Sequence, residues 1–411
     1  PTAPPNNTPP LRTTDYQLPT SAAMQSFALN ETHEMIRDTA REFARNEVAP
    51  TAIERDINAE FPHEAIKKLG ELGFMGMMVS SEYGGAELDT VSYVIAMEEI
   101  SKVDASVGVV MSVNNSLVCW ALEKYGTEEQ KKKYLEPLAT GQKLGAYALS
   151  EPEAGSDATQ QRTEAKKNEN GDWVLNGTKN WITNGTTADI FIVYAQTDRE
   201  KGYKGINCFI VEKGLEGFTH GVKEDKLGIR SSDTCSLQFQ DVVVPDANVL
   251  GEQQRGFYVA MQTLNGGRIG IGAQALGIAQ GALDAALQYA QERKAFGEPI
   301  AKLQAIQFKL AEMATKIEAA RLLLYEAASK KDRNEDFIKA ASMAKLFASK
   351  TAVEVALEAI QIHGGYGYVR EYKVERYLRD AKITEIYEGT SEIQHIVIAR
   401  QLQKEFEATT G

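Results

Sequence analysis

Residues 383–400 read ITEIYEGTSEIQHIVIAR and place one carboxylate, that of Glu388, directly between an aromatic residue and a glycine. Apolar neighbours such as Ile386 and Tyr387 desolvate a carboxylate, and desolvation raises the pKa of a Glu toward the range that suits a general base. In most proteins, a Glu beside a Tyr near a helix start is a surface or capping residue. The stretch alone therefore leaves two interpretations open: a base that removes a proton from carbon, or an ordinary helix-start residue.

The composition is that of a globular chain with an acidic surface. The 411 residues are 43% hydrophobic and 25% charged, which is enough for a large core and, by length, for roughly two to three domains. The net charge of -12 argues against a general binder of nucleic acid or of an anionic membrane, because such binders need basic surfaces. Local cations must then hold any polyanionic ligand.

The spacing of cysteine and histidine gives no sign of a metal site or a disulfide framework. Cys119, Cys208 and Cys235 lie far apart without a CxxC pair, and the pair His33 and Glu34 has no second His at the spacing of a zinc helix. No apolar run approaches the roughly 20 residues that span a bilayer. We therefore expect reduced thiols, no metal and no membrane segment.

The first part of the chain changes from a polar leader to a helical pattern. Residues 1–24 are rich in Pro, Thr, Asn and Ser and have no apolar centre, which predicts a disordered leader or an added segment. Residues 25–144 predict an N-terminal helical domain. Its first helix begins after the N-cap Asn30 and is expected to stop at Pro50.

The rest of the chain predicts a β-domain followed by a helical bundle, and so an α+β fold. Residues 145–255 hold short β-branched and aromatic runs divided by Gly, Asn and Asp, which is typical of an antiparallel barrel or sandwich. Residues 256–411 return to long amphipathic helices with short connectors, the pattern of a four-helix bundle. The expected helices cover residues 256–292, 302–331, 336–363 and 391–405.

This order of domains, together with several motifs, resembles the acyl-CoA dehydrogenase family, most closely its short-chain, butyryl-CoA branch. The similarity covers nearly everything from Phe27 to Phe406. Its densest motifs are MSVNNSL (111–117), ALSEPEAGSDA (148–158), WVLNGTKNWITNG (173–185), EDKLGIRSS (224–232) and QIHGGYGYV (361–369).

The resemblance implies an FAD-dependent enzyme of fatty-acid β-oxidation. Such an enzyme converts a short-chain acyl-CoA to the trans-2-enoyl-CoA and passes electrons to electron-transfer flavoprotein. Glu388 becomes the base that removes the α-proton while the β-hydrogen leaves as hydride to flavin N5. The implied assembly is a homotetramer, a dimer of dimers, in the cytoplasm of a bacterium or, alternatively, in the mitochondrial matrix.

The implied flavin site combines a strand with a polar loop. Trp181 offers a flat surface, and Thr183 places a hydroxyl on the same side of a strand two residues later. Without the resemblance, these two are an ordinary core Trp and strand Thr. The cofactor contacts implied by the resemblance are Tyr147, Leu149, Ser150, Ser156, Trp181, Ile182, Thr183, Arg293, Gln304, Gln361, Gly364, Gly365, Thr390 and Glu392.

The implied substrate contacts are Ser156, Asn265, Arg268 and Gly389. Arg268 is the cation assigned to the CoA phosphates. The short-chain branch usually has Asp and a larger residue where this chain has Asn265 and Gly266, which puts the contact at Asn265 in doubt. The same segment nearly matches a dinucleotide fingerprint, but the strand that should precede it is missing, so NAD is not expected.

Four alternatives to a short-chain dehydrogenase remain. Some relatives carry the base just before the CoA-binding arginine, but that position is Gly267 here. Glu388 is then the candidate base, and branched-chain or medium-chain substrates are the less favoured options. An acyl-CoA oxidase shares the half-reaction, and a decarboxylating glutaryl-CoA enzyme would need a cation in the acyl pocket that the sequence does not identify. From a different class, a non-catalytic acyl-CoA-binding protein could keep the fold but lose the base or the flavin contacts.

Overall fold

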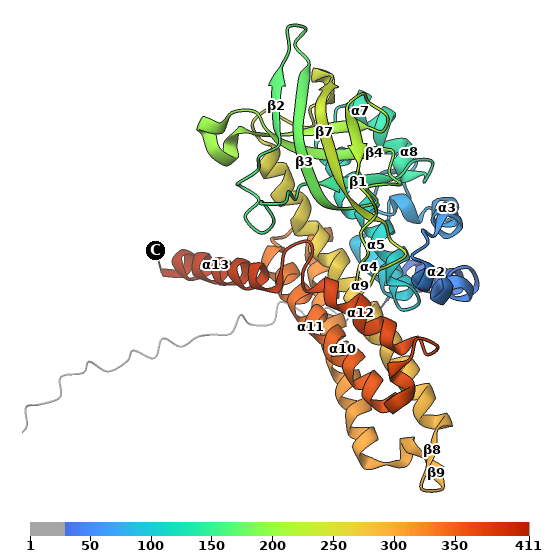
Figure 1. Cartoon of the computed structure of the whole chain (residues 1–411). Coiled ribbons are helices and arrows are strands. Elements are labelled where there is room, and N and C mark those ends of the chain that lie inside the picture. Colours follow the sequence, from blue (N-terminus) through green and yellow to red (C-terminus); the bar gives the residue numbers. More distant parts are fainter. Residues whose placement is uncertain (1–28, 411) are drawn as a thin grey trace, which may run out of the picture.

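The computed structural model describes residues 29–410, so the expected leader at 1–24 lies outside the described residues. A helical N-terminal part, a curled sheet and a set of long helices follow one another along the chain (Figure 1). The predicted α+β architecture is confirmed. The sheet lies at one end of the molecule, and the long helices run from it toward the other end (Figure 1).

The first helix begins where the sequence predicts but does not stop at Pro50. The side chain of Asn30 accepts a hydrogen bond from the His33 amide at 2.8 Å and caps α1 (Glu31–Phe43). A π turn and a short 3-10 turn that contains Pro50 then lead into α2 (Ala52–Asn58). Proline is tolerated in a first turn, because the amide that it lacks has no partner there.

The apolar centre of the N-terminal part is one long helical stretch. Residues Ala105–Tyr125 are long and apolar enough to cross a membrane, and 94% of the most apolar window is buried inside the protein. The expectation that no apolar run approaches such a length is therefore wrong for the described part of the chain. The stretch is a core helix, packed against α4 (Thr90–Ser101) and the first long helix of the C-terminal part.

The sheet is mixed and not wholly antiparallel. Its seven strands follow the order β1-β4-β2-β3-β7-β6, with β5 paired to the other side of β4. The pair β1 and β4 is parallel, whereas β3 with β7 and β4 with β5 are antiparallel. The strands are β1 (Gly145–Ala148), β2 (Glu164–Lys167), β3 (Trp173–Thr183), β4 (Ile190–Gln196), β5 (Ile206–Glu212), β6 (Phe218–His220) and β7 (Thr234–Val244).

The C-terminal helices are close to their predicted bounds. The longest, α9, runs alongside α10, α11 and α12 (Figure 1). A shorter helix, α12, lies between the third and last predicted helices and was not predicted separately. The bounds are α9 (Gly256–Glu292), α10 (Gln304–Asp332), α11 (Ile338–His363), α12 (Val374–Thr384) and α13 (Ser391–Thr410).

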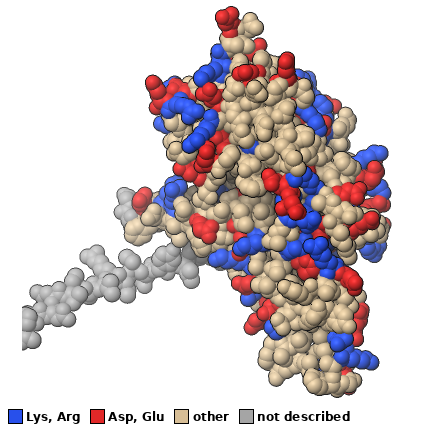
Figure 2. Space-filling view, in the orientation of Figure 1, with Lys and Arg blue, Asp and Glu red and all other residues tan. Residues whose placement is uncertain are grey.

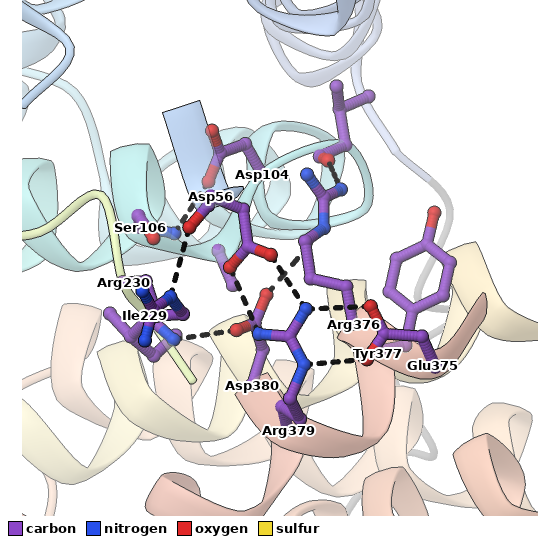
Figure 3. A network of polar contacts seen from close by, with 12 residues as sticks. Asp56, Asp104, Ser106, Ile229, Arg230, Glu375, Arg376, Tyr377, Arg379 and Asp380 are labelled. Carbon is purple, nitrogen blue, oxygen red and sulfur yellow. Dashed lines mark hydrogen bonds and ion pairs between the residues drawn. The ribbon is translucent and has the colours of Figure 1, made fainter. Parts of the chain in front are cut away.

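A buried network of charges joins the three parts of the molecule (Figure 3). Arg379 on α12 donates to both carboxylate oxygens of Asp56 on α2, at 3.0 and 2.6 Å. The loop after β6 joins through the Ile229 amide, which donates to Asp380 at 2.6 Å, and through Arg230, which donates to the Asp56 carbonyl at 3.0 Å. These contacts hold α12 in place, and the turn that carries Glu388 follows α12 directly.

Candidate active site

Glu388 lies in the tight turn between α12 and α13. Its φ is +52° and that of Gly389 is +96°. A left-handed conformation is uncommon for a residue with a side chain, and such conformations cluster at functional sites. The turn is closed by the Ser391 amide, which donates to the Glu385 carbonyl at 3.0 Å. The backbone thus fixes the direction in which the Glu388 side chain leaves the turn.

The Glu388 carboxylate is buried and incompletely paired. Its Oε2 atom is buried and has no hydrogen-bond partner within residues 29–410. Burial raises the pKa of Glu388, and the cations Lys345 and Arg268 act in the opposite direction. A buried carboxylate with a free oxygen and a raised pKa is suited to accept a proton from a ligand.

Gly267 on α9 leaves the space that this carboxylate occupies. A Cβ atom at position 267 would lie 2.3 Å from Oε2 of Glu388 and 2.8 Å from Cδ2 of Leu117. The alternative base position considered from the sequence is therefore in direct contact with Glu388. A side chain at 267 and the present position of Glu388 exclude each other.

Lys345 on α11 is a feature of the site that the sequence interpretation missed. It is 1% exposed, and its Nζ donates to the Tyr387 carbonyl at 2.6 Å and to the Gly389 carbonyl. Burial lowers the pKa of Lys345, which the nearby Glu388 opposes. A signal was available, because Lys345 shares a helix face with Ala341, Ala348 and Ala352, all of which are buried.

Arg268 and Asn265, both expected from the sequence to contact the substrate, lie in contact with each other. The Arg268 Nη1 donates to the Asn265 side-chain oxygen at 2.8 Å, and the Arg268 Nε has no partner among the described residues. Burial lowers the pKa of Arg268 to about 10. The guanidinium thus keeps donor capacity for an anionic or carbonyl ligand.

A hydrogen-bonded pair of side chains, Tyr387 and Gln274, lies further along α9, beyond Gly267. The Tyr387 hydroxyl donates to the Gln274 side-chain oxygen, and the Gln274 amide donates to the Ala105 carbonyl at 2.8 Å. Gln274 is two helical turns beyond Gly267, about 10 Å along the helix at 1.5 Å per residue. The sequence interpretation also missed this pair, because its members are far apart in the chain.

The strand and loop predicted to hold the flavin are joined in the structure. The Asn180 amide in β3 donates to the Ser150 carbonyl at 2.8 Å. The pairing of β3 with β7 is interrupted between Lys179 and Ile182, and Trp181, at a φ of +61°, is 62% exposed. Ile182 is buried in the β-domain core, so its backbone is the part that can meet a ligand.

Lys179 is a second residue that the sequence interpretation missed, and it binds the loop that contains Leu149 and Glu151. Lys179 is fully buried and donates to the Leu149 carbonyl at 3.1 Å and to the Glu151 carboxylate at 2.8 Å. Burial lowers the pKa of Lys179 to about 8, against the effect of Glu151. Glu151 also accepts from the Thr163 amide at 3.1 Å.

The remaining predicted residues divide between this region and a distant one. Tyr147 is buried and lies within electrostatic range of Glu388, Ser156 is exposed in its loop, and Thr183 is half-buried at the end of β3. Thr390 precedes α13, where its hydroxyl accepts from the Ile393 amide at 3.4 Å, and Glu392 is exposed on that helix.

Arg293, Gly364 and Gly365 line a cavity of about 630 Å³ at the other end of α9. Gln304 and Gln361 are exposed on α10 and α11. About 38 Å of helix separates Gly267 from the residue before Arg293, at 1.5 Å per residue. The predicted cofactor residues therefore form two sets that lie far apart within one chain. No group of three His, Cys, Asp or Glu side chains in the described part of the chain could hold a metal ion.

Comparison with known proteins gives the same family for the whole chain. Residues 30–142, 146–242 and 254–403 match the models of the N-terminal, middle and C-terminal domains of acyl-CoA dehydrogenase. The mitochondrial short-chain specific acyl-CoA dehydrogenase of Mus musculus is 53% identical over 93% of this chain and 92% of its own length. The short-chain specific enzyme of Clostridium acetobutylicum is 51% identical over 92% of this chain and 99% of its own length.

Solved structures agree with these sequence relatives. The butyryl-CoA dehydrogenase of Megasphaera elsdenii has a TM-score of 0.91 and 49% identity, and covers 92% of this chain and all of its own. A chain from a study of the electron transferring flavoprotein of Acidaminococcus fermentans has a TM-score of 0.91 and 51% identity, with 92% and 99% covered. The chain described here belongs to the acyl-CoA dehydrogenase family.

Proposed function

We propose that this protein catalyses the FAD-dependent α,β-dehydrogenation of a short-chain acyl-CoA to the trans-2-enoyl-CoA, a step of fatty-acid β-oxidation. The observation that carries the proposal is the Glu388 carboxylate, which is buried, has a free oxygen and lies between two cations. Relatives of about half-identical sequence are short-chain or butyryl-CoA dehydrogenases.

Glu388 acts as the base that removes the α-proton. The free Oε2 accepts this proton, and burial favours the neutral, protonated product of the transfer. Lys345 and Arg268 keep enough of the carboxylate ionised before the transfer. Because the α-carbon of a thioester is a weak acid, a strongly ionised, fully solvated Glu would be a poorer base in this position.

The thioester oxygen needs a donor while the α-proton leaves. Within residues 29–410 the Glu388 amide donates to no backbone carbonyl, and it lies on the same residue as the base. An amide held in place for a developing negative charge contributes about 100- to 1,000-fold in rate. We therefore assign the Glu388 N–H to the thioester carbonyl and the region of Arg268 and Asn265 to the CoA moiety.

The residues around β3 and its adjoining loop fit a flavin. Trp181 exposes a flat aromatic surface, strand β1 contributes Tyr147, and the loop after β1 contributes Leu149 and Ser150. Lys179 and Glu151 fix this loop, so it is formed before a ligand arrives. FAD, when bound, supplies the acceptor for the β-hydrogen and its electron pair.

The two sets of cofactor residues lie too far apart to meet within one chain, so the cofactor site needs a second subunit, and we propose a homotetramer built as a dimer of such dimers. Arg293 with the glycines at 364 and 365 would reach the cofactor of a neighbouring subunit, where a guanidinium suits a pyrophosphate. An apolar patch on α10 and α11, formed by Leu322, Leu323 and Phe347, offers an interface between subunits. Charges of both signs cover much of the face seen in Figure 2.

A short substrate is favoured by the pair of Tyr387 and Gln274. This polar, hydrogen-bonded pair lies about 10 Å beyond Gly267 along α9, where a longer acyl chain would have to displace it at the cost of buried hydrogen bonds.

Electron-transfer flavoprotein is the proposed acceptor, in line with the similar chain from the Acidaminococcus fermentans study. Relatives occur in bacteria and mitochondria, and we propose the bacterial cytoplasm, with the mitochondrial matrix as the alternative.

Anaerobic titration of the purified enzyme tests this proposal. Butyryl-CoA should bleach the oxidised flavin band at close to one equivalent per site, and a long-chain acyl-CoA should bleach it far more slowly. Bound flavin that stays oxidised with every acyl-CoA would contradict the dehydrogenase and favour a non-catalytic acyl-CoA-binding protein. Rapid reoxidation of the reduced enzyme by oxygen would favour an oxidase.

A further inference from the structure

Lys345 binds the two carbonyl groups on either side of the base. Its Nζ donates to the Tyr387 carbonyl oxygen at 2.6 Å and to the Gly389 carbonyl oxygen, and the side-chain amide of Gln394 donates to the same Gly389 oxygen at 2.9 Å. Lys345 is 1% exposed, and placing a cation there is costly unless its donors are used. The ammonium group is thus held by backbone atoms, not by a carboxylate.

The first of these carbonyls belongs to the same peptide unit as the Glu388 amide. A peptide bond is planar and trans, so its C=O and N–H point in opposite directions. When Lys345 holds the Tyr387 oxygen, the Glu388 N–H is fixed toward the other side of that plane. A cation on the oxygen also polarises the peptide, and linked hydrogen bonds strengthen one another by about 10–30%.

We propose that Lys345 is a positioning residue for the reaction: its ammonium group clamps the turn around Glu388 and orients and strengthens the Glu388 N–H as donor to the thioester oxygen. This role rests on the function proposed above. Lys345 touches neither the substrate nor the cofactor, and acts through the peptide between Tyr387 and Glu388.

The charges around Glu388 give the same residue a second, measurable effect. The titratable groups that face Glu388 are Arg268 from α9, Lys345 from α11, Tyr93 from α4, Tyr147 from β1 and the adjacent Tyr387. Of these, Arg268 carries a positive charge, and Lys345, whose pKa burial lowers to about 7, carries one in its protonated form. Without Lys345, Arg268 is the one remaining cation that opposes the effect of burial on the Glu388 carboxylate, so the pKa of Glu388 must rise further.

The test compares Lys345→Met with the wild-type holoenzyme and with Ser349→Ala. Ser349 is one turn further along α11 and donates to the Thr384 carbonyl at 2.9 Å, so it ties the same helix to the same segment without touching the turn. The first readout is the infrared carbonyl stretch of bound trans-2-enoyl-CoA labelled with carbon-13 at the thioester. The second is the pH dependence of flavin reduction by butyryl-CoA.

In Lys345→Met we expect the bound carbonyl stretch to move back toward its value in water. Flavin reduction at neutral pH should slow by about 10- to 100-fold, less than the loss of a whole oxyanion donor. The acid limb of the pH profile of flavin reduction should move to higher pH, so that part of the lost reduction rate returns in alkaline buffer. Ser349→Ala should keep the wild-type carbonyl stretching frequency and the wild-type acid limb of the pH profile, even if its melting temperature falls.

A rate lowered by one factor at every pH, together with an unchanged carbonyl stretch, would overturn the proposal and leave Lys345 a structural residue. If Lys345→Met does not fold, Lys345→Gln takes its place, because its side-chain amide can donate to one of the two carbonyls. It should give intermediate shifts of the carbonyl stretch and of the acid limb. Wild-type values of both in Lys345→Gln would overturn the positioning role. A wild-type enzyme that does not reduce its flavin with any acyl-CoA would instead overturn the function proposed above.

Discussion

Gly267→Ala should inactivate the enzyme without unfolding it. The new methyl group would lie 2.3 Å from Oε2 of Glu388, whereas non-bonded contacts of carbon settle at about 3.5 Å. The carboxylate must therefore retreat by roughly 1 Å. A misplacement of that size costs on the order of 100-fold in rate, which is the expected fall in kcat.

Gly267→Ala should keep the thermal stability of the wild type, because the atom that the new methyl group displaces is the end of the flexible Glu388 side chain. The methyl group also meets Leu117 at 2.8 Å, a contact that small shifts can relieve. Alanine is favoured over glycine in a helix interior by about 1 kcal/mol. Thermal melting of the holoenzyme should thus stay within a few degrees of wild type.

Gly266→Ala is the matched control for this substitution. A Cβ at 266 would meet the Lys331 side chain at 3.7 and 3.9 Å, an ordinary contact, and nothing nearer. It gains the same helix propensity, so both melting temperature and kcat should equal or exceed wild type. The assay is stopped-flow flavin reduction by butyryl-CoA for both variants. A Gly267→Ala enzyme with the wild-type rate, or equal losses in both variants, would refute the assigned geometry.

Three further outcomes are expected. Because burial raises the pKa of Glu388 in the ligand-free protein and only the ionised carboxylate accepts a proton, kcat/KM should fall with decreasing pH along a limb above the usual Glu value of about 4.3, and a profile of kcat/KM with its limb at that usual value would contradict the burial. Arg293→Ala should lower the ratio of flavin to protein after gel filtration, whereas full flavin occupancy would argue against a pyrophosphate role. Asp56→Ala removes one of the two carboxylates that Arg379 holds, at 3.0 and 2.6 Å, and leaves Glu375 as the other, so it should cost about 1.5–3 kcal/mol of unfolding free energy. Denaturant titration measures that loss, and a change below about 1 kcal/mol would show that the network in Figure 3 does not stabilise the fold.

Local patterns in the sequence predicted the elements that depend on local chemistry. The cap at Asn30 and the long C-terminal helices follow from capping residues and periodicity. Glu388 and Gly267 could be named because a reactive residue type and an absent side chain are visible in the sequence itself. That the two are in contact was not visible, since they are 121 positions apart in the chain.

The features that the sequence did not predict depend on contacts between distant segments. The parallel pairing of β1 with β4 was not predicted, because the alternation of side chains along a strand is the same in either direction. Lys345 occurs within an alanine-rich helix face, and its role exists only because the turn at Glu388 lies against it. Pro50 was expected to end a helix, but it occupies a first turn in which proline is accommodated.

The most direct test of the central claim is single-turnover flavin reduction in Glu388→Gln. The amide keeps the size of the carboxylate but cannot take the α-proton, so FAD content and acyl-CoA binding should persist while the reduction rate falls by on the order of 10⁴-fold. A Glu388→Gln holoenzyme that reduces its flavin at close to the wild-type rate would contradict the assignment of Glu388 as the base.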